Sequence, residues 1–265
     1  MPVGITEFVR QYGPMALVCG GSEGVGAAYA MQLAERGLDL ALIARKPGPL
    51  EETAAAIRKA HPTRKALTRS VDLTAPDAVA AIRELTGNRE VGLLIHNAGA
   101  SSQTGDFVDS DLAFAQGLVA VNDTAMLALV HAYGGQMKAR GRGGIVLVSS
   151  FAGLVGQPGL ATYSAVKAFS TTFAEALWFE LKPHGVHVLS HMLGLTATPA
   201  NARHYPAMAG LGEDSSDIAR QGLDAIAQGP ILRAAGGDDM AKAFAGLDRG
   251  AAVEQMYEAG AAFRD

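Results

Sequence analysis

Tyr163 and Lys167 have the spacing of residues that share one side of a helix. They are four residues apart in Tyr-Ser-Ala-Val-Lys, within a stretch of helical pattern, so the phenol and the ammonium should be neighbours. A free phenol has a pKa near ~10, and a positive charge a few ångströms away would lower it. By spacing alone, the pair predicts a phenol beside a positive charge, although a Y-x-x-x-K match can also arise by chance.

Two further polar residues have the chemistry to complete such a site. Ser150 ends an apolar run over residues 145–150, and a hydroxyl at a strand end would reach the crevice where a dinucleotide binds. Because strand ends of one sheet edge converge on that crevice, Ser150 and Tyr163 can meet there. Asn122 lies inside a long helical pattern, although asparagine is a poor helix former. It either serves the site or is simply a tolerated polar residue.

A glycine-rich turn, Gly-Gly-Ser-Glu-Gly-Val-Gly over residues 20–26, follows an apolar run and opens a helical pattern. In such a turn Gly20 permits the tight bend, Gly24 lets the backbone approach a pyrophosphate, and Gly26 lets helix and strand pack closely. The N–H groups of the helix start favour an anion. An ordinary glycine turn is the alternative, but the strand–turn–helix setting favours dinucleotide binding.

The ends of two later strands offer further cofactor contacts. Asp72, followed by Leu73, is placed to accept a hydrogen bond from an adenine amine, or else to cap the next helix. Asn97, Ala98 and Gly99 would let a ribose lie against the backbone, or else form a simple turn.

The end of the second strand bears on the choice of cofactor. An acidic residue is expected there if the ligand is NAD, but the strand ends Ala44-Arg45-Lys46. The Arg45 guanidinium could hold a 2′-phosphate, although both basic residues could equally be solvated. Glu23 opposes this interpretation because its charge would repel the phosphate. The pattern favours NADP(H) over NAD(H).

Elements that position these residues alternate along the chain as strands and helices. Strands buried on both faces are predicted at 15–19, 38–44, 66–71, 91–96, 144–149 and 186–192, because these runs are apolar at nearly every position. Residues 230–234 are predicted as a short last strand. Helices are predicted at 24–36, 50–61, 75–86, 109–140, 161–184 and 217–227. This alternation is typical of βαβ units in a mostly parallel sheet of about seven strands, with helices on both faces. Residues 199–216 break the pattern and are predicted as a mobile substrate loop, and the tail 238–265 as helical.

Composition narrows the class of protein. The 265 residues carry a net charge of −4, which gives no reason to expect nucleic acid or an anionic membrane as partner. We expect no signal peptide or transmembrane helix. The single cysteine, Cys19, suits a reducing cytoplasm and reads as a core residue. His184, His187 and His191 cluster near one strand, but structural histidines are favoured over a metal site.

The chain resembles the short-chain dehydrogenase/reductase family, single-domain branch, from about residue 15 to 235. The family's T-G-x-x-x-G-x-G corresponds to residues 19–26, with cysteine first, and N-N-A-G to residues 96–99, with histidine first. S-S-x-A-G matches residues 149–153 and Y-x-x-x-K matches Tyr163 and Lys167. P-G-x-V-x-T corresponds to residues 193–198, with leucine first, a departure that falls on the nicotinamide side of the site.

The resemblance implies one Rossmann-like, doubly wound domain over residues 1–265 and a role for each site residue. Tyr163 would be the general acid/base, Lys167 would bind the nicotinamide ribose, Ser150 would bind the substrate oxygen, and Asn122 would hold a water next to Lys167. The cofactor contacts expected are Gly20, Ser22, Glu23, Gly24, Val25, Gly26, Arg45, Asp72, Leu73, Asn97, Ala98, Gly99, Tyr163, Lys167, Thr196 and Thr198.

The expected activity is hydride transfer between NADP(H) and an uncharged, apolar ketone or secondary alcohol. Substrate contacts are expected from Phe151, Leu154 and Tyr205, with Val155, Met192 and Met208 as further candidates, although several could simply pack in the core. A homodimer or homotetramer is expected, because the 109–140 and 161–184 helices carry more apolar positions than one sheet face can hide. Two alternatives are a non-catalytic dinucleotide sensor or scaffold, and a redox-silent dehydratase or isomerase on the same fold.

Overall fold

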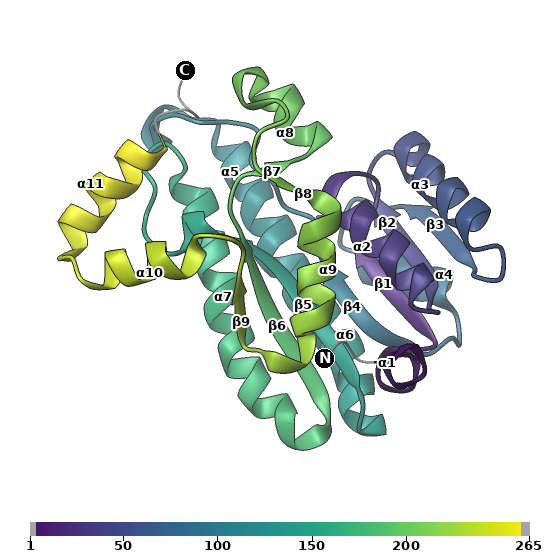
Figure 1. Ribbon diagram of the computed structural model, residues 1–265. Coiled ribbons are helices and arrows are strands. Elements are labelled where there is room, and N and C mark those ends of the chain that lie inside the picture. Colours follow the sequence, from purple (N-terminus) through teal and green to yellow (C-terminus); the bar gives the residue numbers. More distant parts are fainter. Residues whose placement is uncertain (1–3, 261–265) are drawn as a thin grey trace.

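A seven-stranded sheet forms the centre of the computed structural model, which describes residues 4–260 (Figure 1). Its strands are β1 (Met15–Cys19), β2 (Asp39–Ala44), β3 (Ala66–Ser70), β4 (Val91–His96), β5 (Gly143–Ser150), β6 (Val186–Leu193) and β9 (Ile231–Arg233). All neighbours pair in parallel, in the order β3-β2-β1-β4-β5-β6-β9. The predicted strands and doubly wound topology are confirmed. The order reverses between β1 and β4, the place where such sheets bind ligands.

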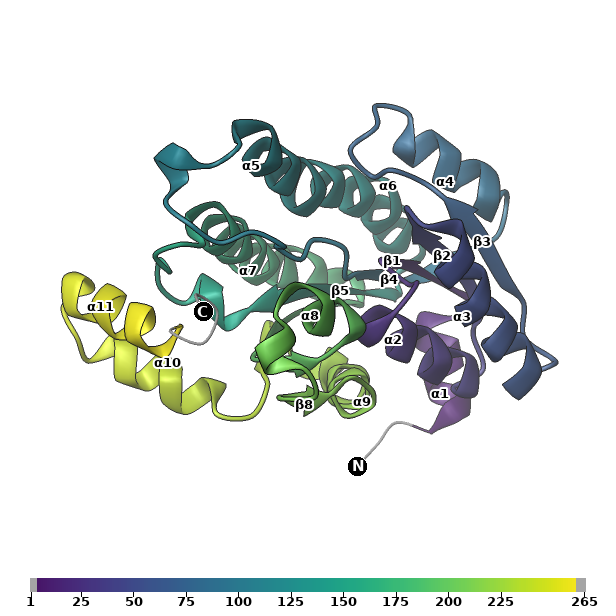
Figure 2. The same ribbon diagram turned by 90° about the horizontal axis from the view of Figure 1, so that it is seen from above.

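Helices cover both faces of the sheet, as Figure 2 shows. One face carries α1 (Ile5–Tyr12), α2 (Gly24–Glu35), α3 (Pro47–Ala60) and α9 (Ser215–Ala225). The other carries α4 (Ala78–Thr86), α6 (Ala125–Arg140) and α7 (Ala161–Leu181). Successive strand residues feed the two faces in turn: Leu17 and Cys19 enter one core cluster, whereas Ala16 and Val18 enter the other. The predicted burial on both faces is confirmed for β1 and β4, but β3 is only partly buried, because it is the outermost strand of the sheet. Cys19 is the buried core residue expected.

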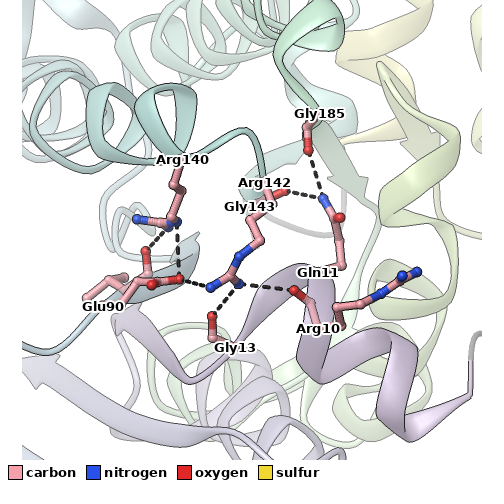
Figure 3. A network of polar contacts seen from close by, with 9 residues as sticks. Arg10, Gln11, Gly13, Glu90, Arg140, Arg142, Gly143 and Gly185 are labelled. Carbon is pink, nitrogen blue, oxygen red and sulfur yellow. Dashed lines mark hydrogen bonds and ion pairs between the residues drawn. The ribbon is translucent and has the colours of Figure 1, made fainter.

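A polar network joins the amino ends of the strands, which form the N-terminal edge of the sheet (Figure 3). Arg142 donates to the carbonyls of Arg10 and Gly13, each at 3.0 Å, and pairs with Glu90. The Nε atom of Arg140 lies 3.3 Å from the same carboxylate. Because these residues precede different strands, the network fixes the strand starts against one another.

Gln11 extends this network from α1. Its Nε2 donates to the carbonyls of Gly185, at 2.8 Å, and Gly143, at 3.2 Å. The sequence analysis did not predict α1, which is short and mostly exposed apart from Phe8 and Tyr12.

The helix predicted over 109–140 is not continuous. A 3-10 turn at Phe107–Asp109 comes first, then α5 (Leu112–Val119), a π-helical turn at Ala120–Thr124, and α6. Asp111 caps α5 by accepting from the N–H of Ala113, so the helix begins there and not at residue 109.

Two other predictions concern the later part of the chain. Residues 199–216 are not structureless: they contain α8 (Pro199–His204), a 3-10 turn at Pro206–Met208 and β8 (Glu213–Asp214). β8 pairs with β7 (Thr196–Ala197). The tail forms α10 (Gly237–Ala245) and α11 (Arg249–Ala259) as predicted, and residues 261–265 lie outside the described residues.

One helical segment within residues 4–260, Leu112–Arg140, is long and apolar enough to span a membrane by length and composition. The sequence analysis predicts no transmembrane helix, because it finds no stretch of about 18 uncharged apolar residues. In the fold this segment is a core helix, since α6 packs Met126, Leu129 and Met137 against the sheet.

Candidate functional site

The glycine turn between β1 and α2 packs directly against the end of β4. Gly20 has φ +86°, and a Cβ atom there would lie 2.8 Å from the backbone nitrogen of Ala98. Gly24 also has positive φ, at +54°, and a Cβ at Gly26 would collide with the carbonyl oxygen of Gly20. These positions accept only glycine without strain, so the predicted tight turn and close helix–strand packing are confirmed.

The start of α2 offers unpaired donors to a ligand. Glu23 occupies the N-cap position, and in the described part of the chain no side chain caps this helix. The first N–H groups of a helix have no partner within the helix, and its dipole favours negative charge there. The turn therefore fits the pyrophosphate of a dinucleotide.

Asn97 holds the turn and does not simply line it. Its Nδ2 donates to the carbonyl of Gly20 at 3.0 Å, and its backbone N–H donates to Cys19 at 2.9 Å. The backbone N–H of Ala98 also donates to the carbonyl of Cys19, at 3.0 Å. These hydrogen bonds hold the end of β4 against the end of β1. They fix the geometry of the crevice between β1 and β4, where the strand order reverses.

Asn122 is brought to the site by the π-helical turn. It is 3% exposed, and its Nδ2 donates to the carbonyl of Leu118 at 2.9 Å. Gly99 has φ +124°, and a Cβ there would collide with the Asn122 side chain. The absence of a side chain at Gly99 therefore makes room for Asn122, and π-helical turns often occur at functional sites.

Ser150, Tyr163 and Lys167 meet at the carboxyl ends of β5 and β6. The Ser150 and Tyr163 hydroxyls are hydrogen-bonded to each other, and the Ser150 Oγ also accepts from the N–H of Ala152 at 3.2 Å. The Lys167 Nζ lies 5.5 Å from the Tyr163 ring centroid and donates to the carbonyl of Val148 at 3.1 Å. The residues singled out by spacing thus form one cluster.

The electrostatics of the cluster differ from the sequence prediction. Burial raises the pKa of Tyr163, and the hydrogen bond from Ser150 only opposes that rise. Burial likewise lowers the pKa of Lys167 to about 8. The expected lowering by Lys167 is absent because desolvation dominates and the lysine points at the carbonyl of Val148. A phenol with a raised pKa stays protonated at neutral pH.

Two titratable residues near Lys167 were missed by the sequence analysis. Burial raises the pKa of Asp123 to about 6, and the charge of Lys167 opposes that rise. Burial lowers the pKa of His96 to about 4, and its Nε2 lies 3.1 Å from the carbonyl of Val121. His96 Nδ1 and Asp123 Oδ1 are buried without a hydrogen-bond partner among the described residues. A histidine ending the apolar run 91–96 was the signal available.

The adenosine end of the predicted site is only partly as expected. Arg45 is exposed at the end of β2, and its carbonyl accepts from the hydroxyl of Ser70 at 2.8 Å. Asp72 accepts from the N–H of Thr74 at 2.9 Å and from its hydroxyl at 2.8 Å, and these bonds lower the pKa of the carboxyl. Asp72 therefore holds the turn that follows β3 and does not cap the next helix, because Asp77 occupies the N-cap position of α4. Leu73 is buried beside it.

The segment after β6 returns to the glycine turn. Thr198 caps α8 by accepting from the N–H of Asn201 at 3.1 Å, and a Cβ at Gly24 would lie 3.1 Å from its Cγ2. Thr196 is buried, and its hydroxyl donates to the carbonyl of Gly194. Thr198 thus lies beside the glycine turn, whereas the contacts of Thr196 are with its own segment.

A cavity of about 450 Å³ opens beside Tyr163. It is lined by Ser101, Gln103, Thr104, Gly105, Asp106, Phe107, Asp109, Ser110, Asp111, Phe114, Ala115, Leu118, Gly159, Leu160, Ala161, Thr162 and Tyr163. Most of this wall belongs to the segment before and within α5, which the sequence analysis did not consider.

The predicted substrate residues divide into two groups. Phe151 packs beside Gly194 and Gly237, and Leu154 packs with the cluster of the C-terminal helices, so neither lines this cavity. Val155, Met192 and Met208 are buried core residues. Tyr205 alone is near the reacting group, since its phenol acts electrostatically on Tyr163.

Two of the three histidines near β6 are hydrogen-bonded to tyrosines. His187 Nδ1 lies 2.7 Å from the Tyr12 hydroxyl, and His191 Nδ1 lies 2.7 Å from the Tyr29 hydroxyl. Within the described residues no group of three or more histidine, cysteine or acidic side chains is arranged to hold a metal ion.

Comparison with known proteins places this geometry in context. The family model described as short chain dehydrogenase matches residues 14–209. The very-long-chain 3-oxoacyl-CoA reductase of Laccaria bicolor is 36% identical over 187 residues, which is 69% of this chain and 55% of that protein. The chain thus spans about half the length of this relative.

Two other similar proteins are covered more completely. The 7beta-hydroxysteroid dehydrogenase of Clostridium sardiniense is 31% identical over 200 residues, 76% of each chain. The solved structure of a short-chain dehydrogenase from Sphingobium yanoikuyae in complex with NADPH is 29% identical, with a TM-score of 0.78 over 90% of this chain and 94% of that one.

Proposed function

The chain belongs to the short-chain dehydrogenase family, and we propose from this that it is an NADP(H)-dependent oxidoreductase that interconverts an uncharged ketone and its secondary alcohol. The observation that carries the proposal is the cluster of Ser150, Tyr163 and Lys167 beside a glycine turn suited to a pyrophosphate. An intact proton-transfer pair argues against a non-catalytic sensor.

The residues divide the chemistry between them. When bound, the nicotinamide supplies or accepts the hydride at the substrate carbon. The Tyr163 hydroxyl donates its proton to the carbonyl oxygen during reduction, and the burial that raises its pKa keeps that proton in place until it is needed. Ser150 hydrogen-bonds the same oxygen and stabilises the negative charge that develops on it.

Lys167 and Asn122 would position the cofactor and resupply protons to the site. Lys167 would bind the nicotinamide ribose, and with a pKa of about 8 it exchanges protons readily near neutral pH. Asn122, held in the π-helical turn, would position a water that returns protons to Lys167. The fit of the glycine turn to a pyrophosphate supports the same placement of the cofactor.

The preference for NADP(H) rests on Arg45. No carboxylate stands at Ala44 to bind a ribose 2′-hydroxyl, and the exposed guanidinium that follows is free to turn toward a 2′-phosphate. The relative from Sphingobium yanoikuyae was solved with NADPH. Arg45→Asp should lower NADPH affinity roughly 10–150-fold, the worth of one charge-assisted contact. Equal affinities for NADPH and NADH in both proteins would contradict this assignment.

An uncharged substrate fits the cavity beside Tyr163. Its rim carries the exposed carboxylates of Asp106, Asp109 and Asp111, which would repel an anionic substrate. Its interior adds the apolar side chains of Phe114 and Leu118.

A panel of uncharged ketones and alcohols, with nicotinamide absorbance followed for NADPH and NADH, tests the proposal. Turnover of at least one compound with a matching absorbance change is the expected result. Conversion of a compound without an absorbance change would favour a dehydratase or isomerase. Tight nucleotide binding with no turnover across the panel would favour a sensor.

A homodimer or homotetramer is proposed from the apolar side chains left exposed on α5, α6 and α7. Val119, Leu127 and Phe169 are each at least 40% exposed, and Phe179 is 73% exposed. Such a surface is typical of an interface between subunits. A monomeric mass in light scattering at micromolar concentration would contradict this proposal.

A further inference from the structure

Arg203 reaches from α8 to the glycine turn and forms a two-pronged ion pair with Glu23. Its Nη1 lies 2.9 Å from Oε2 and its Nη2 lies 2.5 Å from Oε1. The two residues are 180 positions apart in the sequence, so the pair joins the segment after β6 to the first turn of the fold. Planar guanidinium and carboxylate groups that pair in this way are held in both distance and orientation.

The pair is part of a larger contact between α8 and the start of α2. Thr198, which caps α8, lies against Gly24. Asn201 donates from Nδ2 to the carbonyl of Thr196 at 2.8 Å, which fixes the first turn of α8 to β7. Figure 2 shows α8 beside the beginning of α2. The ion pair therefore lies at the same helix start that offers its free N–H groups to a diphosphate.

Glu23 is surrounded by positive charge on this side of the molecule. Besides Arg203, the side chains of Lys46 and His204 act electrostatically on its carboxylate. Lys46 follows Arg45 at the end of β2. The Glu23 carboxylate therefore faces the end of β2, and its charge would repel a 2′-phosphate bound there if it were left uncompensated.

We propose that Arg203 is a cofactor-specificity residue that acts through Glu23: by pairing with the carboxylate, it cancels the negative charge that would otherwise repel a nucleotide 2′-phosphate. The inference rests on the proposed binding of NADP(H). It assigns to a residue of the 199–216 segment an effect at the adenosine end of the cofactor. A phosphate is repelled by a carboxylate more strongly than a hydroxyl is, so Arg203 should matter for NADPH and little for NADH.

The test is a double-mutant cycle on cofactor binding, read as Kd from nicotinamide fluorescence. Arg203→Gln should weaken NADPH binding about tenfold and NADH binding less than about threefold, since the charge left uncompensated on Glu23 repels the 2′-phosphate and not the 2′-hydroxyl. Glu23→Gln alone should tighten NADPH binding relative to NADH binding, since it removes the repelling carboxylate and leaves the Arg203 charge in place. The double variant should restore the wild-type ratio of NADPH to NADH affinity. Arg220→Gln, which removes an exposed arginine paired with Asp217 on α9, is the matched control.

Two results would overturn the inference while leaving the proposed function intact. Equal weakening of NADPH and NADH by Arg203→Gln would make Arg203 a clamp for α8 without influence on specificity. Loss of NADPH binding that persists in the Glu23→Gln background would mean that Arg203 contacts the phosphate itself. Wild-type protein that binds neither nucleotide would instead overturn the proposed function, and this inference with it.

Discussion

The two edges of the sheet differ in how their polar groups are used. At the N-terminal edge, Glu90 lies between Arg140 and Arg142, and the latter also bonds two backbone carbonyls. At the C-terminal edge, His96 and Asp123 each keep a buried polar atom without a hydrogen-bond partner among residues 4–260. Unpartnered buried groups cost stability. Arg140 Nε at the N-terminal edge also lacks a hydrogen bond, but it lies 3.3 Å from the Glu90 carboxylate. The comparison indicates that ion pairs hold the strand starts together, whereas the strand ends give up stability to keep buried polar groups near the reacting cluster.

The largest expected effect is a loss of kcat without a loss of stability, from a substitution at the C-terminal edge. Tyr163→Phe should lower kcat at least about 100-fold, because the proton donor is lost while the ring that packs beside Lys167 remains. Cofactor Kd and the free energy of unfolding should change little. Tyr257→Phe on α11 serves as the control. If the Tyr163 variant kept more than a tenth of wild-type kcat, another group would have to be the acid.

At the N-terminal edge the expected effect has the opposite character. Arg142→Ala removes two hydrogen bonds to carbonyls and one partner of Glu90, and should lower the free energy of unfolding by about 2–3 kcal/mol. Denaturant titration measures the loss, and kcat at low temperature should stay at the wild-type value. Arg10→Ala, whose side chain is 79% exposed on α1, is the control. A large fall in kcat without a fall in stability would remove the contrast between the edges.

The smallest effect sharpens the comparison through pH. In the folded protein the pKa of Asp123 is about 6, against an ordinary value of 3.8, so between these values the folded state keeps a proton that the unfolded state releases. Stability from this group is complete below pH 3.8 and is lost as pH rises through 6. Asp123→Asn should therefore raise the free energy of unfolding at pH 7.5 by about 1 kcal/mol, a figure reduced for solvent screening of a half-exposed group.

The gain from Asp123→Asn should fade as pH falls toward 3.8. Stability curves for wild type and variant at several pH values make the comparison, with Asp239→Asn on the exposed side of α10 as the control. A variant equally stabilised at every pH would show that the effect does not come from the titration of Asp123.

Much of the sheet and the reacting cluster could be predicted because the signals are local. Strands such as β4 and β5 are short apolar runs, and Tyr163 and Lys167 share a helix. Glycines 20, 24 and 26 were interpretable because each solves a steric problem within one turn. Such features depend on residues close in the sequence, so pattern and spacing suffice.

Other features depend on contacts that no local pattern reveals. The π-helical turn that aims Asn122 inward fits around Gly99, twenty-three positions earlier in the chain. The pairing of Arg203 with Glu23 joins residues still further apart. Residues 101–111 show neither helical nor strand periodicity in their apolar positions. The sequence analysis therefore did not predict that they line the cavity beside Tyr163. The pKa values of Tyr163 and Lys167 depend on burial, which spacing alone could not supply.

The pairing of β7 with β8 has a consequence for how this protein can diversify. Thr196 pairs with Glu213 and Ala197 with Asp214 in a short parallel ladder. Both ends of the segment between β7 and β8 are therefore anchored in that ladder. Glu213 is itself held, since one of its carboxylate oxygens accepts from the N–H of Ala235 at 3.0 Å. A segment whose ends are fixed side by side can lengthen at little entropic cost. Residues 198–212 can therefore accept insertions or deletions that change the surface near the reacting groups. The register of the seven-stranded sheet need not change.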